Sequence, residues 1–220
     1  MRNLFLTTMI FAASFMSIFA QTDVTTYSQN DTPAPQFGVK GGVNISTLTS
    51  DDFDDPDSRT SFNAGVFLEI PLNDRFSIQP EVLYSEQGFT IKQNDQDNLF
   101  DTDENYEYQL SYIQVPIMAK VYLVKGLNIE VGPQFGFKVN EEFDFQPTTD
   151  DGDIEIEDED SYIKDFDTSV AFGAGYKFDN GLFFNARYTL GLTNIFEDNT
   201  ILGDVDAKNA VWQFGLGFAF

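Results

Sequence analysis

Residues 127–139 read LNIEVGPQFGFKV, and every second position in this stretch is apolar. The positions between them hold Asn, Glu, Gln, Lys and two glycines. A period of two is typical of a β-strand whose two faces meet different surroundings. The stretch is also long, because a soluble strand usually has about five or six residues and a tilted membrane-crossing strand needs about 9–11. Residues 127–139 therefore predict a strand that crosses a membrane.

Seven other stretches show the same alternation, so the sequence predicts eight strands. They are residues 36–46, 61–72, 76–85, 112–123, 127–139, 166–178, 182–192 and 210–220. Three connections are very short, at 73–75, 125–126 and 179–181, and they alternate with four long ones, at 47–60, 86–111, 140–165 and 193–209. Short turns on one side and long loops on the other are typical of outer-membrane β-barrels.

The polar face of these strands decides which side of the sheet points inward. Ten of the sixteen glycines lie on it, and a narrow eight-stranded barrel leaves little interior room for side chains. We therefore expect the polar face to line the lumen and the apolar face to meet lipid. A soluble, lipocalin-like barrel is the alternative, and it would need the Phe, Leu and Ile face inside. The strand charges also share the polar face, where we expect an ion-pair network of Lys40, Glu69, Glu81, Lys120, Glu130, Lys138, Asp167, Lys177 and Arg187.

The expected fold is all-β: an eight-stranded, antiparallel, up-and-down transmembrane β-barrel over residues 36–220, with short periplasmic turns and long acidic extracellular loops. Three prolines fit this fold poorly. Pro80, Pro116 and Pro133 lie inside expected strands, where each removes one donor from the hydrogen-bond ladder. We expect bulges at these prolines, or positions close to the barrel rim.

The first twenty residues have the features of a secretory signal peptide. Arg2 supplies a basic start, residues 4–19 are nearly all apolar, and Ala20 offers a small residue at the cleavage point. We expect removal of residues 1–20 and a flexible periplasmic lead-in at 21–35. No other stretch approaches the length of about 18 apolar residues that a membrane-spanning helix needs.

The composition excludes several kinds of function. The chain of 220 residues has 12 Lys and Arg, 36 Asp and Glu, a net charge of −24, and neither His nor Cys. A Ser-His-Asp triad, a Cys nucleophile and a His- or Cys-ligated zinc site are therefore impossible. We expect no catalytic residues, no enzymatic activity and no cofactor. The negative charge also argues against nucleic-acid binding, which needs a basic surface.

Twenty-eight of the 36 acidic residues lie in the four long connections. The densest run, at 150–160, offers carboxylates for a Ca²⁺ or Mg²⁺ ion, although its spacing is not that of an EF-hand. The alternative is a solvated, self-repelling loop. Ordering of this loop by millimolar Ca²⁺ would favour the metal site, and an unchanged hydrogen-exchange profile would favour the solvated loop. The candidate ligands are Asp150, Asp151, Asp153, Glu155 and Glu157.

Several short motifs resemble the outer-membrane β-barrel family that is often labelled PorT-like or "porin family". They are FGVKGGVN at 37–44, QPEVLYS at 79–85, VPI at 115–117, GP at 132–133 and ARY at 186–188. The resemblance covers residues 36–220, and Gln114 departs from it where an acidic residue is expected. The founding member is tied to a protein secretion machine, but a shared scaffold does not transfer that role. The C-terminal strand, with Phe218 and Phe220, looks like the signal that barrel assembly machinery reads.

We therefore expect a protein of the bacterial outer membrane with a lumen filled by its own side chains. Its expected role is structural or the docking of partners in the cell envelope. A small cation-preferring pore and an accessory component of a protein secretion machine are the alternatives. The expected partners are outer-membrane lipid, the barrel assembly machinery, other envelope or secretion proteins and divalent cations, with no nucleic acid.

Overall fold

The computed structural model describes residues 34–50, 57–93, 104–144, 153–155, 161, 163–196 and 206–220. Within these ranges, the side chains of 91–93, 104–106 and 153–155 are left out of the description. The predicted signal peptide and almost all of the lead-in lie outside the described residues. All strands below belong to one compact unit, Thr32–Phe220. The described residues include no helix that is long and apolar enough to cross a membrane.

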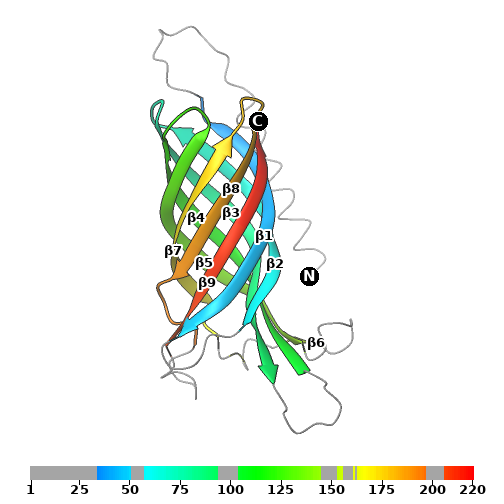
Figure 1. Ribbon diagram of the computed structural model, residues 1–220. Helices are drawn as coiled ribbons and strands as arrows, with labels where there is room; N and C mark the ends of the chain where they lie inside the picture. Colours follow the sequence, from blue (N-terminus) through cyan, green and yellow to red (C-terminus); the bar gives the residue numbers. More distant parts are fainter. Residues whose placement is uncertain are drawn as a thin grey trace, which may run out of the picture. The chain divides into compact units, whose positions relative to one another are not determined.

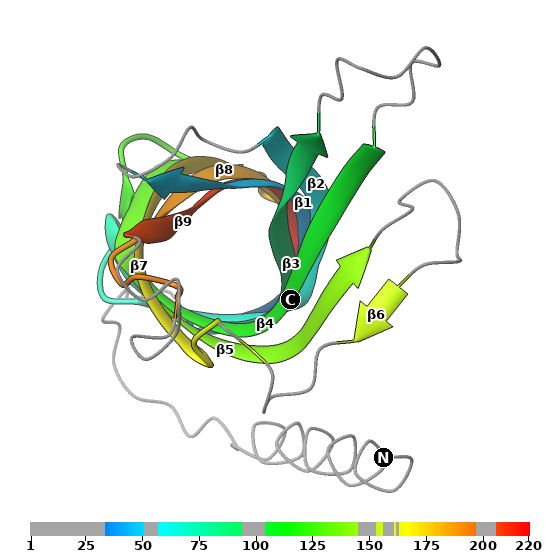
Figure 2. The same cartoon turned by 90° about the horizontal axis from the view of Figure 1, so that it is seen from below.

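One antiparallel sheet holds nine strands within the described residues. They are β1 (Gln36–Ser50), β2 (Asp57–Pro71), β3 (Phe76–Gln93), β4 (Glu104–Tyr122), β5 (Leu127–Asp144), β6 (Asp153–Glu155), β7 (Phe166–Lys177), β8 (Leu182–Gly191) and β9 (Ala207–Ala219). The sheet closes because β1 pairs with both β2 and β9, and Figure 2 shows the resulting ring. The three-residue strand β6 pairs only with the far end of β5. The predicted eight-stranded antiparallel barrel is therefore confirmed.

The barrel has two unlike ends. The short turns at 72–75, 123–126 and 178–181 lie at one end, here called the turn end (top of Figure 1). Gly126 and Gly181 have φ angles of 82° and 87°, which favour glycine and allow these tight reversals. The opposite end, here called the loop end, carries the long connections. There β3 and β4 project as a hairpin beyond the neighbouring strands (Figure 1).

The strands at the loop end are longer than predicted. Residues of the predicted loop 86–111 continue the pairing of β3 and β4 from Glu86↔Ser111 to Gln93↔Glu104. The predicted loops at 47–60 and 140–165 also lose residues, because β1 ends at Ser50, β2 begins at Asp57 and β5 ends at Asp144. In the extended part of β3, Gln87, Phe89 and Thr90 are all buried, so backbone pairing continues there without a regular alternation of apolar and polar side chains. These boundaries could not be found from the period of two.

The proline prediction was wrong. The register on either side of Pro80, Pro116 and Pro133 is unchanged, and the two register shifts lie elsewhere, between Ser58 and Asn63 and between Ser111 and Tyr112. None of the three prolines lies at a rim. The ladder instead omits two consecutive pairs at Pro116 and two at Pro133 and then resumes in register. Each strand of the closed barrel pairs with a neighbour on both sides, so the loss of one hydrogen-bond donor does not shift its register.

The predicted assignment of faces is confirmed by burial. On β5, Val131 is 53% exposed on the outer wall, whereas Glu130 and Gln134 are buried in the lumen. On β9, Phe214 faces outward and Gln213 inward. The largest exposed side chains of the barrel are therefore apolar, and the buried side chains are mostly polar. This inversion of the soluble pattern fits a wall that meets lipid.

Gly65 on β2 provides a stability test of this tight wall. A Cβ atom added there would lie 2.0 Å from the backbone oxygen of Val82 on β3. At Gly41, on the outer face of β1, the nearest atom would be at an ordinary 3.4 Å. We expect Gly65→Ala to lower the free energy of unfolding by about 2–3 kcal/mol, because backbone must move, and Gly41→Ala to change it by less than about 1 kcal/mol. Urea unfolding of both variants would check this, and equal effects would contradict it.

The lumen and its two ends

A buried cluster of charged side chains fills the middle of the lumen. Arg187 on β8 is fully buried, and its guanidinium lies 2.8 Å from Glu81 Oε1 and 2.9 Å from Glu130 Oε1. Lys40 on β1 approaches Glu81 Oε2 from another side, at 3.1 Å. Asn185 also donates to Glu130. Each buried charge therefore has a partner, as a site away from water requires.

A second group of polar side chains continues this cluster toward the turn end. Gln79 connects the two, because its Nε2 donates to Glu81 and its Oε1 accepts from Lys120. Glu69 then accepts hydrogen bonds from Lys177, Tyr122 and Ser77. The result is one connected network that crosses the lumen on seven strands of the barrel. The seven predicted residues in it are Lys40, Glu69, Glu81, Lys120, Glu130, Lys177 and Arg187.

Two of the nine predicted residues do not join this network. Lys138 lies eight positions beyond Glu130 on β5, at the loop end, where it pairs with Glu141 at 2.7 Å and donates to Ser161. Asp167 accepts hydrogen bonds from Thr193 and Asn209, and no described Lys or Arg forms an ion pair with it. Both side chains face the lumen side, as expected, but at a different height. The sequence pattern predicts which face of the barrel wall a side chain is on. Its position along the barrel axis depends on the register between neighbouring strands.

An apolar cluster that the alternating pattern does not predict closes the loop end. Leu48, Leu110 and Tyr112 lie on the lumen side of β1 and β4, where the polar positions give way to apolar ones. The connecting segments contribute Ile163, Ile195 and Phe196, which meet through an isolated bridge between Ile163 and Phe196. The available signal was this change from polar to apolar side chains on the inner face. The whole cluster is Leu48, Phe89, Leu110, Tyr112, Ile163, Ile195, Phe196 and Ala207.

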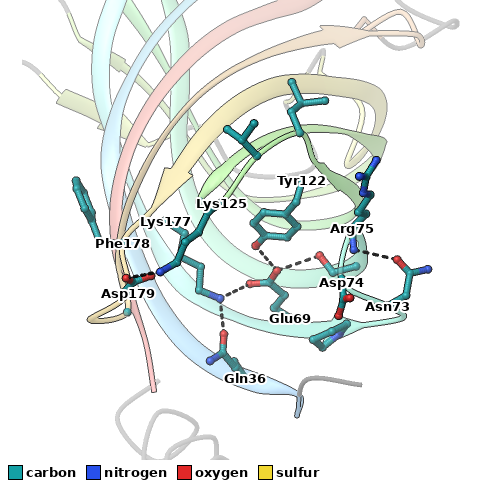
Figure 3. Close-up of a pocket in the computed structure, with 16 residues that line it drawn as sticks. Gln36, Glu69, Asn73, Asp74, Arg75, Tyr122, Lys125, Lys177, Phe178 and Asp179 are labelled. Carbon is teal, nitrogen blue, oxygen red and sulfur yellow. Dashed lines mark hydrogen bonds and ion pairs between the residues drawn. The ribbon is translucent and has the colours of Figure 1, made fainter. Parts of the chain in front are cut away.

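The turn end is open by comparison. A pocket of about 520 Å³ lies there, and Figure 3 shows Glu69 and Lys177 at its base with the turn residues around its rim. At the rim, Lys125 forms an ion pair of 2.6 Å with Asp179, and both side chains are highly exposed. The hydrogen bond to Asp179 raises the pKa of Lys125 above its ordinary value. The pocket ends at Glu69, whose carboxylate already accepts hydrogen bonds from Lys177, Tyr122 and Ser77.

Several of the remaining predicted site residues are not among the residues that the structure describes. Asp150, Asp151 and Glu157 lie outside the described residues, and only the backbone of Asp153 and Glu155 is described, in β6. Elsewhere in the described chain, no group of three or more acidic side chains is arranged to hold a metal ion. Phe218 and Phe220 face outward at the turn end, and the amide of Phe220 donates to Phe37 O. Their role as an assembly signal stays a prediction.

Comparison with known proteins gives this barrel its family. The model of the outer membrane protein beta-barrel domain family matches residues 19–197. The chain belongs to this family. Members are outer-membrane proteins, so the barrel lies in the bacterial outer membrane. In such barrels the short turns face the periplasm, so we expect the turn end to face the periplasm and the loop end to face the outside of the cell.

Solved structures share the fold of this family member at low sequence identity. Neisserial surface protein A is 12% identical to this chain. The match covers 86% of this chain and 100% of that protein, with a TM-score of 0.54. The attachment invasion locus protein Ail of Yersinia pestis is 14% identical, with 86% and 100% coverage and a TM-score of 0.46. No curated protein sequence matches the chain. At these identities the likeness concerns the fold alone.

Proposed function

We propose that this barrel is a non-conducting structural protein of the outer membrane that docks other envelope components at its loop end. The observation that carries the proposal is closure of the lumen at two heights. The network around Arg187 occupies the middle, and the apolar cluster around Leu110 covers the loop end. Between them, Gln114, Gln134 and Gln213 are each at most 5% exposed. Their burial supports a lumen that is filled by side chains along the described part of the barrel.

This closure favours a structural barrel over the cation-preferring pore. Eight strands leave an interior that side chains can fill, and the lumen network pairs four basic with three acidic groups. A path for cations needs water and an uncompensated acidic lining. Catalysis is not part of the proposal, because the chain has no His or Cys and its central carboxylates Glu81 and Glu130 are held in ion pairs.

The proposed docking role rests on the strands that extend past the barrel wall. The β3–β4 hairpin continues to Gln93 and Glu104, and the outer end of β5 pairs with β6. The acidic residues of these extensions, and the position of β6 as the last strand in the sheet order, suit contacts with other envelope proteins. Components of protein secretion are one class of candidate partner, which the shared scaffold alone does not establish. Cross-linking in intact cells should capture a partner that is lost when residues 91–106 are replaced by a tight turn.

Electrical recording tests closure directly. We expect the purified protein in planar lipid bilayers to give no discrete channel openings, because the lumen contains two filled layers. A porin inserted under the same conditions serves as the positive control, and resistance of the barrel to SDS before heating shows that the protein is folded. Regular, cation-selective openings of the folded protein would contradict the proposal and favour the small pore.

A further inference from the structure

A groove of about 660 Å³ crosses the outer wall of the barrel. It extends over β1, β9, β8 and β7, which are consecutive neighbours in the sheet, and reaches the first residue of β5. Three of these strands, β1, β9 and β8, lie side by side in Figure 1. The side chains around the groove are almost all apolar. The groove therefore opens toward lipid and not toward the lumen.

Three small outward-facing residues form the floor of the groove. Ala174 pairs with Ala186 across β7 and β8, and Gly41 lies on β1 opposite Leu216. Large neighbours form the walls: Phe184, Phe214 and Leu216 are each about half exposed, with values of 50%, 48% and 58%. The wall is thus hollowed between these large side chains.

The groove lies in the half of the membrane nearest the periplasm. Gly41 is five residues from the start of β1, which places it about 13 Å above the turn end for a rise of about 3.3 Å per residue and a tilt of about 40°. This is about half of an apolar band about 25 Å tall. At its other end the groove reaches Leu127, the first residue of β5. It therefore runs from mid-membrane to the periplasmic rim.

An exposed pair of opposite charges stands where the groove reaches that rim. Lys125 and Asp179 lie 2.6 Å apart, with side chains 82% and 77% exposed. Tyr176 joins this pair to the groove: its ring stacks on Phe184 at 6.0 Å and lies against Gly126, the neighbour of Lys125. Tyrosine is common at the membrane–water interface, where its ring meets lipid and its hydroxyl meets headgroups. The apolar groove, the ring of Tyr176 and the charged pair thus follow one another toward the periplasmic rim.

We propose that this groove is a binding site for one phospholipid of the periplasmic leaflet that has a zwitterionic headgroup. One acyl chain lies along Gly41, Ala174 and Ala186, the phosphate meets Lys125, and the ammonium group meets Asp179. A second barrel would also bury the apolar groove, but two opposite charges at its rim complement a zwitterionic headgroup. The proposal rests on the outer-membrane location and does not depend on whether the lumen conducts.

Native mass spectrometry of the detergent-extracted protein tests the acyl-chain part. With added phosphatidylethanolamine, we expect one bound lipid per barrel. Ala186→Leu fills the groove, and it should weaken binding about tenfold, which corresponds to lost contacts of about two methylene groups. Ala174→Leu is a second groove variant, used if the first does not fold. Ala119→Leu is the matched control, because Ala119 also faces outward but lies on β4, away from the groove.

The headgroup part needs a separate pair of variants. Lys125→Ala should weaken phosphatidylethanolamine binding, whereas Lys208→Ala should not, because the exposed pair Lys208–Asp206 lies at the loop end. Phosphatidylglycerol, which lacks the ammonium group, should bind more weakly than phosphatidylethanolamine. Equal loss in Ala186→Leu and Ala119→Leu, equal binding of both lipids, or dimers that disappear in Ala186→Leu would each overturn the proposal.

Discussion

Arg187→Met is expected to lower the free energy of unfolding by about 3–5 kcal/mol, the cost of removing one member of a buried ion pair. Arg187 is fully buried and is shared by Glu81 and Glu130. Without it, Glu81 keeps Lys40 and Gln79, whereas the one hydrogen bond that Glu130 keeps among the described residues comes from the amide of Asn185. An uncompensated carboxylate would then remain in the lumen. Urea unfolding in lipid vesicles, followed by the fluorescence of the single Trp212, measures the change.

Two further variants separate the loss of the ion pair from other effects. Adding Glu130→Gln to Arg187→Met removes the stranded charge, so the double variant should recover part of the lost stability. Lys208→Met breaks an exposed ion pair and should cost less than about 1 kcal/mol. If Arg187→Met costs no more than Lys208→Met, the middle of the lumen is hydrated and the closed-lumen account is wrong.

Val131→Lys is expected to lower the free energy of unfolding by about 2–4 kcal/mol, the cost of a lysine on the lipid face near the membrane midplane. Val131 is outward-facing and is the fifth residue of β5 from the turn end. Its strand pairs with β4 and β7 on either side, so it cannot turn the new charge into the lumen without losing register. The same vesicle unfolding assay measures this cost.

The control for Val131→Lys is the same substitution at a position outside the apolar band. Val124 is also an exposed apolar residue, but it lies in the short turn at 123–126. Val124→Lys should cost less than about 1 kcal/mol, because the penalty for a charge fades near the interface. Equal costs at both positions, or a larger cost at Val124, would contradict the placement of Val131 in the apolar band.

The fold could be predicted because one short-range pattern carries most of it. Alternation at residues 127–139, with Gly132 and Gly136 on the polar side, gave both the strand and its inward face. A membrane barrel makes this pattern strong, since one face meets only lipid. The extensions to Gln93 and Glu104 were missed because the regular alternation is lost there, as at Gln87, Phe89 and Thr90, which are all buried. Pro116 and Pro133 were misjudged because ring closure, which keeps the register, is not a local property.

The site was predicted less completely than the fold. The alternation of inward- and outward-facing positions identified the charges that face the lumen, but it does not give their position along the barrel axis. Lys138 and Asp167 were therefore grouped with a network that they do not join. Gln79, which links the two halves of that network, looks like any polar strand residue. Ile195 and Phe196 come from a connecting segment whose contacts depend on the assembled barrel.

The central claim, a lumen closed by its own side chains, is tested most directly by labelling one cysteine. The chain has no Cys, so Gln134→Cys places a single thiol between the central network and the apolar cluster, and Asp74→Cys places one in an exposed turn. We predict that a water-soluble maleimide labels the turn cysteine rapidly and the lumen cysteine only after heat unfolding in SDS. Labelling of both folded variants at the same rate would contradict the account.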